Sequence, residues 1–342
     1  MDKNNFWNNH TLNNFQQLAI LKNVHSFKIS SLCFLKDGRI ASSSGDNNLF
    51  IYSKITFKIE IRIREKLRIF YMNITKDGIL ITCLNATYLN LYEIKGKTYS
   101  IIQTIIPYTF FHNIIGKMTD LFIIQKFIEL KNGDIVFLLW QYALCFYRKK
   151  ENSKEYSYIN KFKQKFNENI TDLCELDDKQ YCLSFKYEHL IKFLDWDKKK
   201  IISTIKIDEL FAFTYSANQL HLINKKDLFL IGESKITIID TKKKEIIKKI
   251  ELDISGYLSC VYKLSDNILL AGFWNKYIAQ FEYDENKKNL KLISNIGKKY
   301  SHSNSPLFSV TSISIFNNSL IVYSYDNDDR NSSLIIHQLK RK

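Results

Sequence analysis

A short sequence pattern recurs along this chain at intervals of 40 to 55 residues. Each copy places a polar turn pair between two apolar, strand-like stretches. The pairs are Asp37-Gly38, Asp77-Gly78, Asn132-Gly133, Asp178-Lys179, Lys226-Asp227, Asp266-Asn267 and Asn317-Asn318. A period of this size predicts a repeat architecture, because one supersecondary unit cannot bury its apolar face alone and must stack on its neighbours.

The first copy, residues 25–53, is the clearest, and its sequence HSFKISSLCFLKDGRIASSSGDNNLFIYS resembles a WD40 repeat. In that family a His, a Ser in the second strand, an Asp in the following turn and a Trp in the third strand form a buried hydrogen-bonded set. The matching positions here are His25, Ser44, Asp46 and Tyr52, with Tyr in place of Trp. The resemblance implies a structural role for these four residues.

The WD40 resemblance implies an all-β fold, a seven-bladed WD40-like β-propeller. Seven blades of about 40 to 45 residues need about 300 residues, which the 342 residues supply. The last repeat has only three strands, and the alternating stretch of residues 15–24 is expected to complete it, which would remove an open sheet edge. We therefore expect a flexible N-terminal tail over residues 1–14 and a single propeller over residues 15–342.

Leader and membrane signals are absent from the sequence pattern. The N-terminus has no basic segment followed by an apolar one, and the longest apolar stretch, residues 135–147, is too short to span a bilayer. Six cysteines lie in apolar strand patterns without any Cys-x-x-Cys pair, which favours reduced core thiols. These features predict a cytoplasmic or nuclear protein with no transmembrane segment.

The net charge of +15 favours an anionic partner, although 43 of the 50 basic residues are lysine, which compositional drift could also produce. Many of these lysines fall in the predicted turns between third and fourth strands, which in a propeller would form a basic bottom face. The candidate anion-binding residues are Lys149, Lys150, Lys198, Lys199, Lys200, Lys242, Lys243, Lys244, Lys287 and Lys288. The other interpretation is that hairpin turns simply collect solvated lysines.

Aromatic residues gather in the connection between the second and third repeats. Tyr108, Phe110 and Phe111 lie close to Pro107 and are the candidate protein-binding residues, since exposed aromatics anchor interfaces. Packing at a strand edge within the blade is the competing interpretation.

Catalytic motifs are not visible in the sequence. The seven histidines form no His-x-x-x-His pair, and no glycine-rich phosphate loop or Gly-x-Ser-x-Gly motif occurs. We therefore expect no enzyme activity, no cofactor and no metal site.

The resemblance and the missing catalytic motifs together predict a non-enzymatic scaffold for protein-protein interaction and complex assembly, whose partners are other proteins in a multi-subunit complex. The alternative is a peripheral binder of an anionic surface, either a phosphoinositide membrane or an RNA-containing particle, with weak lipid or RNA contact through the basic bottom face. Arginine is scarce, which disfavours sequence-specific nucleic-acid recognition.

Overall fold

A computed structural model describes residues 6–7, 9–85, 87–106, 124–139, 143–162, 170–177, 179–185, 190–207, 219–232, 235–252, 257–274, 277–296, 310–326 and 331–340. The chain divides into two compact units, residues 35–208 and residues 1–34 with 209–342, and each is treated by itself. In the described part of the chain the regular structure is almost entirely β-strand.

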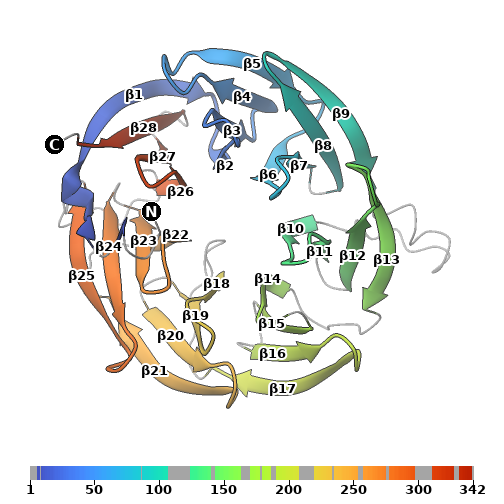
Figure 1. Cartoon of the computed structure of the whole chain (residues 1–342), viewed down its shortest axis with the longest axis vertical. Coiled ribbons are helices and arrows are strands. Elements are labelled where there is room, and N and C mark those ends of the chain that lie inside the picture. The colour runs from blue at the N-terminus through green and yellow to red at the C-terminus, as the bar shows by residue number, and fades with distance from the viewer. Residues whose placement is uncertain are drawn as a thin grey trace. The chain divides into compact units, whose positions relative to one another are not determined.

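The described strands form seven four-stranded antiparallel sheets, which is the architecture of a seven-bladed β-propeller (Figure 1). Each of the first six sheets takes four strands in sequence order, so that the order within a blade is, for example, β6-β7-β8-β9. The seventh has the order β1-β28-β27-β26. The fold class expected from the repeat is confirmed.

The strands of residues 35–208 belong to blades 1 to 4. They are β3 (Ile40–Ser44), β4 (Asn48–Tyr52) and β5 (Ile59–Arg64) of blade 1; β6 (Ile69–Ile74), β7 (Leu80–Leu84), β8 (Tyr88–Lys95) and β9 (Thr98–Ile105) of blade 2; β10 (Ile124–Glu129), β11 (Ile135–Leu139), β12 (Ala143–Lys149) and β13 (Tyr156–Phe162) of blade 3; and β14 (Ile170–Glu175), β15 (Gln180–Phe185), β16 (Leu190–Asp195) and β17 (Lys200–Lys206) of blade 4.

The other unit holds the remaining strands. They are β1 (Phe15–His25) of blade 7; β2 (Ile29–Phe34), the first strand of blade 1; β18 (Gln219–Leu222), β19 (Asp227–Ile231), β20 (Lys235–Asp240) and β21 (Glu245–Glu251) of blade 5; β22 (Leu258–Lys263), β23 (Ile268–Phe273), β24 (Ile278–Asp284) and β25 (Asn289–Ile296) of blade 6; and β26 (Val310–Phe316), β27 (Leu320–Asp326) and β28 (Ser332–Leu339) of blade 7.

The second strands of the blades are deeply buried, because each has a strand on both sides. In β7, β11 and β19 all five residues are buried. Leucine, isoleucine and phenylalanine fill most of the positions in these three strands, as expected for a pleated surface packed on both sides. These strands therefore contribute continuous apolar layers to the core, whereas the buried β3 carries three serines.

The turn between the first and second strands of each blade lies at the expected polar pair, and this confirms the period found in the sequence. Gly38, Gly78 and Gly133 have φ of 89°, 88° and 86°, a region that favours glycine. Their N–H groups close tight turns by donating to the carbonyls of Leu35, Thr75 and Leu130.

The expected closing strand is confirmed. β1 pairs antiparallel with β28 in a register that joins Phe15 to Leu339 and Leu21 to Leu334. This makes the fourth strand of blade 7 out of the N-terminal segment, so the two terminal strands stabilise the same sheet.

Residues 6, 7 and 12–14 pack against blades 6 and 7, where we expected a flexible tail. The indole of Trp7 is 2% exposed, stacks on Phe15 and donates to Asn318 Oδ1 at 3.0 Å. Leu12, in a 3-10 turn over Leu12–Asn14, donates its N–H to Gln280 Oε1 at 2.8 Å. The composition of this segment is strongly polar, which suggested a tail. It also contains two aromatic residues, Phe6 and Trp7, and their burial in the apolar cluster of blades 6 and 7 fixes the position of this part of the segment.

Apolar clusters lie between successive blades within each unit. One joins blades 2 and 3 around Phe137 and Tyr147, and another joins blades 5 and 6 around Phe229 and Tyr283. The helical part of the described chain contains no segment long and apolar enough to cross a membrane. The expectation of one domain over residues 15–342 stays a prediction.

Candidate interaction surfaces

Ser42, Ser44 and Tyr52 of the first repeat are buried and Asp46 is half-buried, and two hydrogen-bonded pairs are visible among them. Tyr52 Oη lies 3.2 Å from Ser42 Oγ, whereas Ser44 Oγ accepts from Asp46 N at 3.2 Å. Burial raises the pKa of Tyr52 to about 12, so its hydroxyl stays protonated and available as a donor. Tyr52, on the third strand, therefore contacts Ser42, which lies two residues before Ser44. His25 is also buried, and the joint role of the four residues stays a prediction.

The turns between third and fourth strands share one design in blades 1, 4, 5 and 6. A capping side chain accepts from backbone N–H groups two or three residues ahead, as Asp240 Oδ1 does from Lys242 and Lys243 at 2.8 Å and Asp284 Oδ1 does from Asn286 and Lys287 at 3.0 Å. The fourth turn residue has positive φ in each case; these residues are Phe57, Lys199, Lys244 and Lys288. The capping residue is Ser53 in blade 1 and an aspartate in blades 4, 5 and 6, and it has a structural role because it satisfies the turn backbone.

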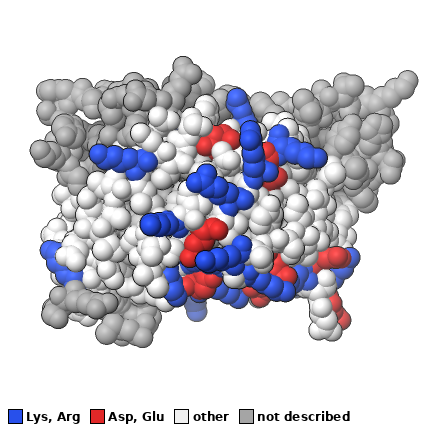
Figure 2. Space-filling view, turned by 90° about the horizontal axis from the view of Figure 1, so that it is seen from above, with Lys and Arg blue, Asp and Glu red and all other residues white. Residues whose placement is uncertain are grey.

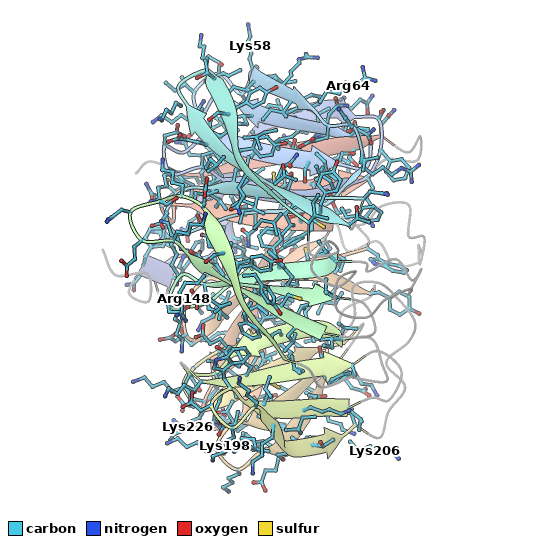
Figure 3. The ribbon with its side chains drawn as sticks, turned by 90° about the vertical axis from the view of Figure 1, so that its right-hand side faces the viewer. Lys58, Arg64, Arg148, Lys198, Lys206 and Lys226 are labelled. Carbon is cyan, nitrogen blue, oxygen red and sulfur yellow. The ribbon has the colours of Figure 1, made fainter. Side chains whose placement is uncertain are left out.

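In blades 1 to 6 the turn between the first and second strands and the turn between the third and fourth strands lie at the same end. We call this end of the blade its turn edge. Trp196 N donates to Lys179 O at 2.8 Å in blade 4, and Thr241 N donates to Lys226 O at 2.8 Å in blade 5, so the two turns of a blade contact each other. Within residues 35–208, Figure 3 shows Arg148 and Lys198 at the turn edge and Arg64 and Lys206 at the opposite strand ends. Lysines lie on described hairpin turns of blades 1 to 6, and a shared basic face stays a prediction.

Six of the ten candidate anion-binding lysines contact carboxylates. Lys149 pairs with Asp77, Lys150 with Glu155 at 2.6 Å, Lys198 with Asp195 at 3.3 Å, Lys243 with Glu245 at 3.4 Å, Lys287 with Asp284 at 3.7 Å and Lys288 with Asp227 at 2.7 Å. Basic and acidic side chains lie side by side in the view of Figure 2. The turn edges are thus charge networks in which most cations have a local counterion, and anion binding by these lysines stays a prediction.

Other turn lysines join neighbouring blades. Lys76 Nζ of blade 2 donates to the carbonyls of Leu130 and Lys131 in blade 3, at 3.0 and 3.1 Å. Lys131 Nζ in turn donates to Leu176 O of blade 4 at 3.2 Å. These ammonium groups satisfy turn carbonyls, so part of the positive charge stabilises the contacts between blades.

The outer strand β9 is exposed and uncharged, which the sequence analysis did not predict. Tyr99 and Ile101 are 45% and 53% exposed, and β9 has no charged residue over Thr98–Ile105. The other six outer strands each carry Lys or Arg, as β5 does at Arg62 and Arg64. The sequence TYSIIQTI shows that the strand is uncharged, but this becomes informative only once β9 is known to be an edge strand.

The predicted protein-binding residues Tyr108, Phe110 and Phe111 lie outside the described residues, which resume at residue 124. That site stays a prediction. Its position in the chain directly follows β9 and Ile106, which is also exposed.

Among the described residues, no group of three or more His, Cys, Asp or Glu side chains could hold a metal ion. His337, the histidine at the Trp-like position of the last repeat, stacks on Tyr323 with ring centroids 5.7 Å apart. Burial lowers the pKa of His337 to about 4, which fits a packing residue.

Comparison with solved structures supports the fold over nearly the whole chain. The WD40 repeats of RRP9 align with a TM-score of 0.70 at 13% identity, covering 95% of this chain and 100% of that one. U3-55K aligns with a TM-score of 0.69 at 13% identity over 94% and 98% of the two chains. Raptor from Chaetomium thermophilum gives 0.70 at 11% identity, and here the 95% of this chain that aligns corresponds to 29% of Raptor.

At these identities the similarity is one of fold, and the fold is that of WD40-repeat structures. No protein-family model matches the chain, and no curated protein matches its sequence.

Proposed function

We propose that this chain is a non-enzymatic scaffold for protein-protein interaction and complex assembly. The observation that carries the proposal is the uncharged outer strand β9. Edge strands are commonly protected from pairing with another chain by lysine or other charged residues, and β9 lacks that protection.

The side chains of β9 are suited to a protein partner. Tyr99 and Ile101 are two residues apart, so they project from the same face of the strand. Tyr99 packs edge-on against Tyr92 of β8, at 6.1 Å between ring centroids, which restrains its ring. An exposed, restrained aromatic beside an aliphatic residue is the kind of anchor that interfaces use.

In the second half of β9, Gln103 contacts the next blade. The Gln103 amide donates to Tyr156 O and accepts from Tyr156 N of β13, both at 2.8 Å. A partner would therefore meet the first half of β9, either by adding a strand along it or by packing on Tyr99 and Ile101.

The anionic-surface alternative has weaker support. A membrane or an RNA-containing particle would need cations free to meet it, and six of the ten candidate lysines already contact carboxylates. We further propose cytoplasmic or nuclear residence, supported by six free cysteines, of which Cys33 and Cys260 have pKa values raised to about 12 by burial.

The test is Ile101→Lys, which gives β9 the charge that the other outer strands have. Leu292→Lys on β25 is the matched control, because Leu292 is an exposed apolar residue on an outer strand that already carries Lys291. Both variants should unfold at the same temperature as the parent chain. Affinity capture from native lysate, read by mass spectrometry, should show a defined set of proteins lost only with Ile101→Lys. Identical capture by all three chains would reject the role of β9.

A further inference from the structure

Two turns of blade 5 bring four lysines together at its turn edge. Lys225 and Lys226 lie between β18 and β19, and Lys242 and Lys243 lie between β20 and β21. Thr241 joins the turns, since its N–H donates to Lys226 O at 2.8 Å and its hydroxyl donates to Lys225 O at 3.3 Å. All four lysine side chains are exposed, and Figure 3 shows Lys226 extending into solvent.

Blade 4 contains the same pair of turns with a different charge pattern. Trp196 N donates to Lys179 O at 2.8 Å, just as Thr241 N does to Lys226 O. The strand registers Gln180↔Asp195 and Asp227↔Asp240 make Lys179 equivalent to Lys226, and they make Asp197 equivalent to Lys242. In blade 4 the two side chains form an ion pair, with Lys179 Nζ 2.6 Å from Asp197 Oδ2.

Blade 5 therefore places two cations where its neighbour in sequence places a cation and an anion. Like charges on neighbouring side chains repel each other, and a bound anion would relieve that repulsion. The nearby carboxylates are already used: Asp227 contacts Lys288, and Asp240 caps its own turn. Among the residues that the structure describes, no ion pair involves Lys225, Lys226 or Lys242.

We propose that Lys226 and Lys242, assisted by Lys225, bind carboxylate side chains of an acidic segment in a partner protein. A carboxylate between the two ammonium groups would take the place that Asp197 takes beside Lys179 in blade 4. This inference rests on the proposed scaffold function. It adds a second partner-binding site, which is separate from β9 and recognises carboxylates.

Acidic residues limit the size of this cationic patch. The turns of the adjoining blade 6 expose Asp266, Asp284 and Glu285. A membrane surface or a nucleic-acid backbone extends over many charges and would meet these carboxylates, whereas a short acidic peptide can avoid them. This limited size favours a short carboxylate-rich peptide.

The experiment measures binding of the full chain to a fluorescein-labelled, glutamate-rich peptide of about ten residues, by anisotropy at low and at physiological salt. Lys242→Asp should form the ion pair with Lys226 that blade 4 already has, so the variant should fold, and peptide affinity should fall about tenfold. Lys97→Asp changes the net charge equally at an exposed turn of blade 2 and should alter affinity by less than about twofold. Asp197→Lys places a second cation beside Lys179, as in blade 5, and should increase the number of peptides bound per chain.

Equal losses with Lys242→Asp and Lys97→Asp, or no added binding with Asp197→Lys, would show that only net charge matters and would overturn the site. Competition in which anionic vesicles or single-stranded RNA displace the peptide at lower concentration would overturn its assignment to a protein. Ile101→Lys should bind the peptide like the parent chain, which separates failure of this site from failure of the β9 proposal.

Discussion

Lys288 Nζ lies 2.9 and 2.7 Å from the two carboxylate oxygens of Asp227, a side chain with no exposed surface. The lysine is on the β24–β25 turn of blade 6 and the aspartate begins β19 of blade 5, so the pair joins two blades. Tyr283 Oη and Asn224 Nδ2 also donate to Asp227, at 2.9 and 3.0 Å. Burial and the neighbouring carboxylate raise the pKa of Tyr283, which keeps its hydroxyl a donor. One candidate anion-binding lysine is thus held by a buried anion.

Removing Lys288 should strongly destabilise the fold. Lys288→Met leaves the buried carboxylate of Asp227 without its cation, and we expect a loss of about 3 kcal/mol in the free energy of unfolding. Urea unfolding followed by circular dichroism measures it. Lys287→Met is the control, because Lys287 is largely exposed and pairs with Asp284 at 3.7 Å, and its effect should stay within about 0.5 kcal/mol. Similar losses of unfolding free energy in the two variants would mean that the buried Lys288–Asp227 pair stabilises the fold no more than an exposed ion pair does.

Asp240→Ala should weaken the β20–β21 turn. It removes the acceptor for the N–H groups of Lys242 and Lys243, and we expect a cost of about 1 to 2 kcal/mol in unfolding free energy at neutral pH. Burial by itself would raise the pKa of Asp240, but these N–H groups and the charges of Lys243 and Lys288 lower it below the ordinary 3.8.

The pH dependence of the Asp240 contribution follows from that lowered pKa. The stabilisation is complete above the ordinary pKa of 3.8 and is lost as the pH falls through the lower folded value. Asp240→Asn keeps an acceptor oxygen without a titrating group, so it should retain most of the stability at pH 7 and lose this acid dependence. Matching acid profiles for the parent chain and Asp240→Asn would contradict the assignment.

Lys199→Gly should stabilise the chain slightly. Lys199 has φ of 48°, a conformation that costs an L-residue about 1 kcal/mol and costs glycine little. Part of this gain is offset by the larger entropy of glycine in the unfolded state, so the melting temperature should rise by a few degrees or less. Lys198→Gly, one residue earlier and outside the positive-φ region, should lower it. A lower melting temperature for Lys199→Gly would show that the lysine side chain contributes more to stability than its positive φ costs.

The period of turn pairs predicted seven repeats, the WD40 resemblance implied that they form blades, and the alternating residues 15–24 predicted the closing strand. These predictions were possible because turn chemistry and strand alternation are local properties. The burial of Trp7 could not be inferred, since it depends on Phe15, Asn318 and other residues far apart in sequence.

The candidate sites were less predictable, because charge and exposure depend on neighbours in space. Lys198 and Lys242 look alike in sequence, yet the first pairs with Asp195, whereas the second lies on a turn that is hydrogen-bonded to the turn of Lys226. The contact between Tyr52 and Ser42 was not predicted, since strand register decides which hydroxyl the ring meets.

His337 should make the fold sensitive to mild acid. Its ring is buried against Tyr323, its Nδ1 has no hydrogen-bond partner among the described residues, and burial lowers its pKa from 6.5 to about 4. Above pH 6.5 the ring is neutral in both the folded and unfolded states and costs nothing. As the pH falls from 6.5 to 4 the unfolded state binds a proton that the folded state does not, so stability falls by about 2 to 3 kcal/mol. His337→Phe keeps an aromatic ring against Tyr323 and removes the titrating group. The difference in urea midpoint between this variant and the parent chain should widen steadily between pH 6.5 and pH 4.5, and a constant difference would show that His337 is not buried in its neutral form.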